Sequence, residues 1–271
     1  MDMKKIIIVL GLLLVPLTTV VGQNKLEKSK NELDSRSTSS SSSSKGARSG
    51  SVDDFDSGLG SISLAVFKYF LIGDYRNENH LSSNLTIYPY YNGTSGSYER
   101  YETDTLKSRQ SRVEMESKFI YSNHTLYGIH LKTRVRPFQY FYFQGDYRQL
   151  YEVNRIENTS DNLGLYHLSL NYDRLRFEKF NLGWNLGVSY VGNQVKEAGF
   201  AYGVAADYFM DSRISFGVSQ RWSNINNSPV NDFELQSRYH RSNYYFSLGY
   251  QRLKIASPVY HFIGLGGGIY F

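Results

Sequence analysis

One polar segment of the sequence could carry covalent chemistry. His167, Ser169, Asn171 and Asp173 occupy alternate positions, so in an extended strand their side chains lie on the same face. A serine close to a histidine can act as a nucleophile that the histidine activates as a general base. His167 and Ser169 are therefore the candidate catalytic residues. In the alternative interpretation, which we favour, the four side chains form a hydrogen-bonded polar interior and catalyse nothing.

The sequence contains no pattern typical of a metal or cofactor site. Its six histidines show no zinc-ligand spacing such as HExxH, and there is no cysteine to supply a thiolate or a disulfide. Residues 264–268 are rich in glycine but lie in a terminal extended segment, whereas a phosphate-binding loop joins a strand to a helix. The 30 basic and 25 acidic residues are spread along the chain, which argues against nucleic-acid binding. We expect no metal, no cofactor and no nucleic-acid partner.

Charged residues of both signs alternate with apolar residues in the C-terminal two thirds of the chain. If the strands close into a narrow barrel, these charges face the lumen and pair across it instead of leaving a water channel. An arginine-rich lining could instead select anions if the lumen were open. The predicted lumen charge network consists of Lys132, Arg134, Asp146, Arg148, Asp173, Arg221, Glu234 and Arg238.

The elements that would position these residues are extended strands with one apolar and one polar or small face. In residues 180–191, for example, Phe180, Leu182 and Trp184 alternate with asparagine and glycine. Most segments have about the 9 to 11 residues that a tilted membrane strand requires, and an even strand number suits antiparallel closure. The ten predicted strands span residues 112–122, 125–136, 138–148, 164–174, 180–191, 198–210, 212–223, 231–241, 243–253 and 259–271.

Composition favours a membrane barrel over a soluble fold. The chain has 24 tyrosines, 16 phenylalanines and 23 glycines, yet its mean hydropathy is only −0.44, a mixture that aromatic girdles around a polar lumen would produce. A soluble β-sandwich is the main alternative, but its strands are usually about 5 or 6 residues long. We predict an all-β, transmembrane, antiparallel up-and-down β-barrel of about ten strands, within a range of 8 to 12, with a short N-terminal helix and a disordered tether.

The N-terminal region divides into four predicted segments before the barrel at 111–271. Residues 1–22 combine two lysines, an apolar stretch and a small-residue cleavage pattern, which indicates a cleaved signal peptide. Residues 23–54, with their serine run, are predicted to be a disordered periplasmic tether. Residues 55–73 show helical spacing and fit an amphipathic interfacial helix, a plug or a first strand. Residues 74–110 form a polar connection in which Pro89 interrupts an extra candidate strand.

The last segment, which ends on Phe271, resembles the closing strand that bacterial outer-membrane barrels present to the barrel-assembly machinery. Its apolar residues Ile263, Leu265, Ile269 and Phe271 share one face. The segment DRLRFEKFNLGW at 173–184 also resembles uncharacterised small barrels of the Bacteroidota type. These resemblances imply a location in the bacterial outer membrane, with its lipid and the assembly machinery as partners, and they imply no activity.

The resemblance also predicts the topology, because outer-membrane barrels alternate short periplasmic turns with longer outer loops. With Phe271 in the periplasm, the outer connections are 149–163, 192–197, 224–230 and 254–258. We expect a structural or surface-binding barrel, with loops such as 149–163 contacting a surface partner or the tether contacting a periplasmic one. A narrow solute channel is the alternative. An envelope lipid hydrolase is the third hypothesis, since His167 and Ser169 resemble the His-x-Ser of lipid A deacylases, although here both would face inward.

Overall fold

The fold is known from a computed structural model of the 271-residue chain. The predicted signal peptide lies outside the residues that this structure describes, as do most residues of the predicted helix at 55–73 and of the connection at 74–110. The structure describes residues 25–35, 71, 73, 78, 81, 85, 86, 88, 89, 111–154, 158–177, 179–210 and 213–271.

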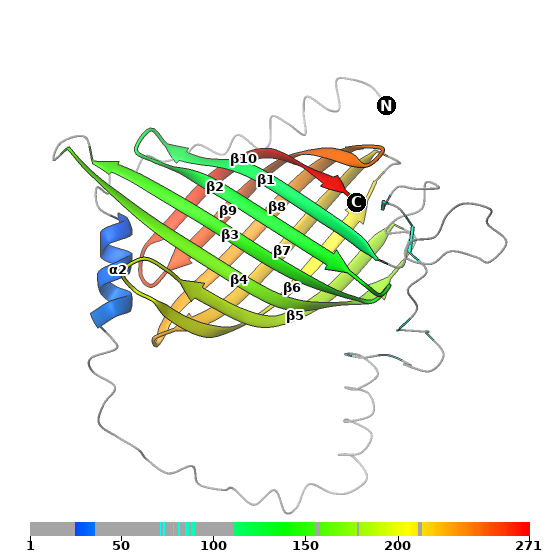
Figure 1. Ribbon diagram of the computed structural model, residues 1–271, viewed down its shortest axis with the longest axis horizontal. Helices are drawn as coiled ribbons and strands as arrows, with labels where there is room; N and C mark the ends of the chain where they lie inside the picture. The colour runs from blue at the N-terminus through cyan, green and yellow to red at the C-terminus, as the bar shows by residue number, and fades with distance from the viewer. Residues whose placement is uncertain are drawn as a thin grey trace, which may run out of the picture.

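Ten antiparallel strands close into a single up-and-down barrel (Figure 1). Each strand pairs with its neighbours in the sequence, and the first strand pairs with the last, so that Glu114 lies opposite Tyr270. The predicted all-β barrel is therefore confirmed. The strands are β1 (Arg112–Asn123), β2 (Leu126–Arg136), β3 (Phe141–Asn154), β4 (Thr159–Arg176), β5 (Phe180–Val191), β6 (Glu197–Phe209), β7 (Ile214–Ile225), β8 (Ser228–Arg241), β9 (Tyr244–Ile255) and β10 (Val259–Tyr270).

The outer wall of the barrel is apolar, and the inner wall is largely polar. Outward side chains such as Leu168 and Leu265 are 65% and 66% exposed, whereas their inward neighbours His167 and Ser169 are buried. This arrangement follows from the two-residue repeat of a strand, which sends successive side chains to opposite faces. No helix in the described part of the chain is long and apolar enough to cross a membrane.

The connections between strands are short at both ends of the barrel. Two of the predicted outer loops are wrong, whereas the connections at 192–196 and 256–258 lie within their predicted bounds. β3 and β4 stay paired as far as Asn154 and Thr159, so the predicted loop at 149–163 shrinks to residues 155–158. The predicted connection at 224–230 shrinks to Asn226 and Asn227, whose φ angles of 50° and 58° are those of a two-residue hairpin turn. The polar residues of these segments lie on strands that continue to the rim of the barrel.

A helix, α2 (Lys25–Ser35), lies across one end of the barrel. This end, the helix mouth, is opposite the C-terminal mouth, where β1 begins and β10 ends (Figure 1). For these residues the prediction of a disordered tether is wrong. The segment is polar on average, but Leu26, Ser29 and Leu33 recur at helical spacing and form a stripe along one face of the helix. The sequence analysis predicts that both the tether and Phe271 lie on the periplasmic side. Because α2 and Phe271 lie at opposite mouths, this prediction cannot hold for both.

Candidate functional site

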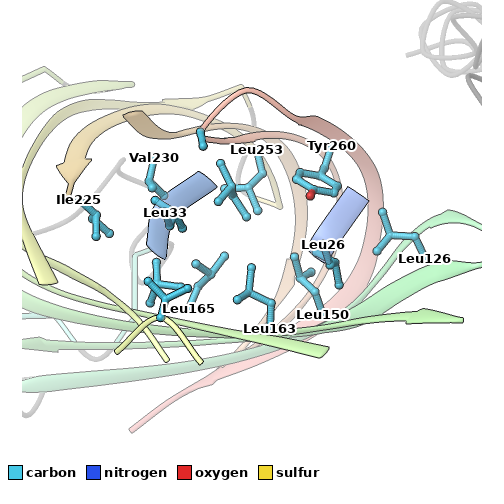
Figure 2. Packing of buried hydrophobic residues seen from close by; sticks show 14 of the residues in the cluster. Leu26, Leu33, Leu126, Leu150, Leu163, Leu165, Ile225, Val230, Leu253 and Tyr260 are labelled. Atoms are coloured by element: carbon cyan, nitrogen blue, oxygen red, sulfur yellow. The ribbon is translucent and has the colours of Figure 1, made fainter. Parts of the chain in front are cut away.

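An apolar collar lines the helix mouth and receives α2 (Figure 2). Leu26 and Leu33 point from the helix into this collar and are fully buried. Burial of a leucine side chain contributes about 1.5–3 kcal/mol, so these two side chains supply most of the apolar stabilisation of the docked helix. The collar consists of Ile120, Leu126, Leu150, Leu163, Leu165, Val191, Val195, Ile225, Val230, Leu253, Ile255, Ala256, Tyr260 and Phe262.

Polar contacts from the barrel rim hold α2 in one orientation. The Glu152 carboxylate accepts hydrogen bonds from the backbone N–H groups of Lys25 (3.2 Å) and Leu26 (2.7 Å). It therefore acts as a cap for the first turn, whose N–H groups have no partner within a helix. Ser29 Oγ lies 2.7 Å from the Tyr260 hydroxyl, which donates to the Lys25 carbonyl oxygen at 2.7 Å.

Two more hydrogen bonds join α2 to other connections between strands of the barrel. The backbone N–H of Ser257, between β9 and β10, donates to Glu32 at 2.9 Å. The Asn226 side chain, in the turn between β7 and β8, donates to the Leu33 carbonyl oxygen. With the ion pair of Lys30 and Asp161, these contacts connect the helix to several hairpins. α2 is thus held at the helix mouth by polar contacts with several connections and strands of the barrel.

Below the collar, ion pairs cross the lumen from wall to wall. Arg148 on β3 lies 3.0 Å from Asp232 on β8, and these two strands are on opposite sides of the ten-strand ring. Lys132 lies 2.7 Å from Glu234. Contacts of this kind cross the interior between the described walls. We call this group the central ionic layer, and it consists of Glu116, Lys118, Lys132, Asp146, Arg148, Arg221, Asp232 and Glu234.

The eight charges predicted for the lumen all point inward, and each lies within 3.5 Å of an opposite charge. Five belong to the central ionic layer. The other three lie at the C-terminal mouth, where Arg134 contacts Glu114 (3.5 Å), Arg238 contacts Asp207 (3.3 Å) and Asp173 contacts Arg136 (2.7 Å).

Several partners of these charges were absent from the predicted network. Two of them, Glu114 and Lys118, lie on β1, together with Glu116, which pairs with Lys118. The sequence contains a signal for these three residues, because they alternate with Met115, Ser117 and Phe119, but the predicted network includes no residue of this strand. The remaining missed partners are Arg136, Asp207 and Asp232.

The structure does not bring His167 and Ser169 together as a catalytic pair. The two residues are two positions apart on the same face of β4, so their Cα atoms are separated by about 7 Å. His167 Nδ1 instead lies 3.1 Å from Ser189 Oγ on β5, and Ser169 Oγ accepts a hydrogen bond from Asn171 Nδ2 at 3.0 Å. Both residues are buried in the lumen wall, where they have no contact with a lipid surface.

A small cavity adjoins His167 between the collar and the central ionic layer. Its lining combines polar residues such as Asp146 and Ser189 with collar residues such as Leu165 and Val230, and its volume is about 20 Å³. A cavity of this size holds about one water molecule. It has no room for an acyl chain or a sugar, so the geometry supports a hydrogen-bonded interior at this point.

The residues of the predicted assembly strand lie at the end of the barrel wall, on β10 and just after it. Ile263, Leu265 and Ile269 on β10 point outward, and their exposed fractions are 41%, 66% and 36%. Phe271 follows the strand, and its backbone N–H donates to the Val113 carbonyl oxygen at 2.8 Å. β10 and β1 therefore form the seam that closes the barrel.

Comparison with solved structures returns bacterial outer-membrane barrels. An outer membrane channel from Pseudomonas putida F1 is 9% identical, with 64% of this chain and 100% of that chain covered and a TM-score of 0.36. Ail, the attachment invasion locus protein of Yersinia pestis, is 13% identical, with 59% and 96% covered and a TM-score of 0.29. Neisserial surface protein A is 13% identical, with 61% and 98% covered and a TM-score of 0.30. No protein-family model and no curated protein sequence matches the chain.

Proposed function

We propose that this protein is an outer-membrane β-barrel with a closed lumen and a structural or surface-binding role. The observation that carries the proposal is a set of contacts that cross the interior at two levels. The ion pair of Arg148 and Asp232 joins opposite walls, and α2 covers the apolar collar above it. A solute would have to separate buried charge pairs and displace a docked helix, each at a cost of several kcal/mol.

The outer wall supports the membrane location. Side chains such as Phe119, Phe200 and Phe246 are 53%, 62% and 61% exposed on the barrel surface. So much exposed apolar area is unfavourable in water and favourable in a hydrocarbon layer. Export through the cleaved signal peptide at residues 1–22, contact with outer-membrane lipid and insertion by the barrel-assembly machinery belong to this proposal, and the likeness to Bacteroidota-type barrels stays a prediction.

The short turns change where a surface partner could bind. Because the connection between β3 and β4 has only residues 155–158 outside the strands, it does not provide the long binding loop that we expected. The exposed side chains of α2, which include Glu27, Lys28 and Asn31, offer a polar surface at the helix mouth instead. We propose this face as the binding surface if the protein has a protein partner.

Planar-bilayer recording tests the closed lumen. We expect no stepwise current from the purified full-length barrel. The matched variant Leu26→Asp/Leu33→Asp, which should release α2, is expected to remain non-conducting because the central ionic layer is intact. Unitary currents from the unmodified protein would reject the closed lumen in favour of the narrow channel.

No observation favours the lipid hydrolase, and we propose that the protein is not an enzyme. Ser169 donates no hydrogen bond to His167 in the structure, and both are buried. Purified protein and its Ser169→Ala variant should therefore show the same background rate on acyl ester and lipid A substrates. Activity that disappears in Ser169→Ala would establish the hydrolase.

A further inference from the structure

Aromatic side chains line the outer wall near the helix mouth on most strands. Tyrosine and tryptophan at such positions lie at the level of the lipid headgroups, where the apolar ring and its polar group each find a suitable environment. β9 and β10 differ, because their outward side chains at this end are Arg252, Lys254 and His261. The aromatic side chains are Tyr121 on β1, Tyr127 on β2, Tyr151 on β3, Tyr166 on β4, Tyr190 on β5 and Trp222 on β7.

The register of the sheet gathers the outward residues of β8, β9 and β10 into one patch. Arg252 on β9 lies opposite His261 on β10 and opposite Phe233 on β8, and neighbouring strands are about 4.8 Å apart. Lys254 lies on the same face, two positions nearer the rim. Tyr250 lies two positions nearer the middle of the barrel, and its hydroxyl is 2.6 Å from His261 Nδ1. We call these five residues the headgroup patch.

The two cations of the headgroup patch have no carboxylate partner in the described part of the chain. Neither Arg252 nor Lys254 forms an ion pair there, in contrast to the lumen, where Arg148 lies 3.0 Å from Asp232. An arginine on the lipid-facing wall is unfavourable at the middle of the bilayer and tolerated close to its surfaces. Both cations belong to the last four residues of β9, which ends at Ile255. They therefore lie near the edge of the membrane, beside the lipid headgroups.

We propose that the headgroup patch binds the phosphate of an anionic lipid in the leaflet that surrounds the helix mouth. The planar fork of Arg252 can donate two parallel N–H bonds to phosphate oxygens, and Lys254 adds a second positive charge about 7 Å along the strand. The ring centres of Phe233 and Tyr250 are 6.5 Å apart, and these rings offer apolar surface to the first part of the acyl chains. A phosphate-bearing lipid uses both the charge and the apolar surface, whereas free phosphate uses only the charge. The proposal rests on the membrane location in the proposed function and is independent of the closed lumen.

Native mass spectrometry of the full-length barrel in detergent, with phosphatidylglycerol or phosphatidylcholine added at equal concentration, tests the proposal. We expect tighter binding of phosphatidylglycerol, because no ammonium in its own headgroup neutralises its phosphate. Arg252→Gln should weaken that binding by roughly fivefold, and Arg252→Gln/Lys254→Gln by about 25-fold, since each cation near the membrane surface contributes separately. Lys28→Gln is the matched control. It removes one positive charge at the same mouth, but from the exposed face of α2, and should leave lipid binding unchanged.

Three results would overturn the proposal. One is equal binding of the two lipids, and another is an equal effect of Arg252→Gln and Lys28→Gln on phosphatidylglycerol binding. The third is displacement of phosphatidylglycerol by inorganic phosphate at equal concentration, which would indicate a site for the free ion. Because Arg252 is exposed on the outer wall, Arg252→Gln should keep the unfolding temperature of the unmodified protein. Retention of neither lipid would reject the membrane location as well as the patch, so the two failures are distinguishable.

Discussion

Truncation of Leu33 should weaken the docking of α2 on the collar while the barrel stays folded. Leu33 is fully buried between the helix and the collar, and Leu→Ala changes at such sites cost about 2–5 kcal/mol. An isolated helix of 11 residues is only marginally stable in water, so once undocked it should also unfold. A loss of about 3 kcal/mol then increases the fraction of undocked helix by roughly 100-fold.

Hydrogen–deuterium exchange measures this change directly, because amides of α2 exchange when the helix undocks and amides of the barrel do not. We expect Leu33→Ala to accelerate exchange in residues 25–35 by roughly 100-fold and to leave β8 unchanged. Asn31→Ala is the matched control, since Asn31 is an exposed residue of the same helix. Equal exchange of α2 in Leu33→Ala and the unmodified protein would refute the view that the collar holds the helix.

Three further variants test other contacts. Glu152→Ala removes the cap of α2 and should weaken docking by about 1 kcal/mol, seen as roughly fivefold faster exchange of α2. Glu234→Gln leaves two buried lysines without their shared carboxylate and should destabilise the barrel by about 3–5 kcal/mol, measured by urea unfolding in detergent. Gly268→Ala would place a Cβ 2.4 Å from the Tyr245 ring and should cost about 1–3 kcal/mol in the same unfolding assay. Gly145→Ala, which meets nothing within 4 Å, should be neutral, and equal effects of the two glycine variants would contradict the packing argument.

The barrel itself was predictable from short stretches of sequence. Alternation in a segment such as β5 assigns each side chain to a face with no knowledge of its neighbours, because the strand repeat of two residues is a local property. For the same reason Lys132, Glu234 and the other predicted charges could be assigned to the lumen. The ends of the strands at the rim were less predictable. Polar residues near Asn154 and Thr159 are as compatible with a loop as with the part of a strand that extends beyond the membrane.

The pairing of charges was decided by the closed barrel. Arg148 and Asp232 are 84 residues apart, and only the closure of β1 on β10 places their strands on opposite sides of one narrow lumen. The partner of His167 is Ser189 across the sheet and not Ser169 on the same strand, because the register between β4 and β5 determines which side chains meet. No local pattern encodes that register.

The sequence by itself determined the strands, their two faces and the apolar end of the chain at Phe271, all of which depend on local periodicity. The tertiary structure alone decided the position of α2, because two leucines and a serine on a polar helix gain stability only where a collar of matching shape surrounds them. It also decided which charges pair at the C-terminal mouth, because Arg238 and Asp207, like Arg136 and Asp173, come from strands that are not consecutive in the chain.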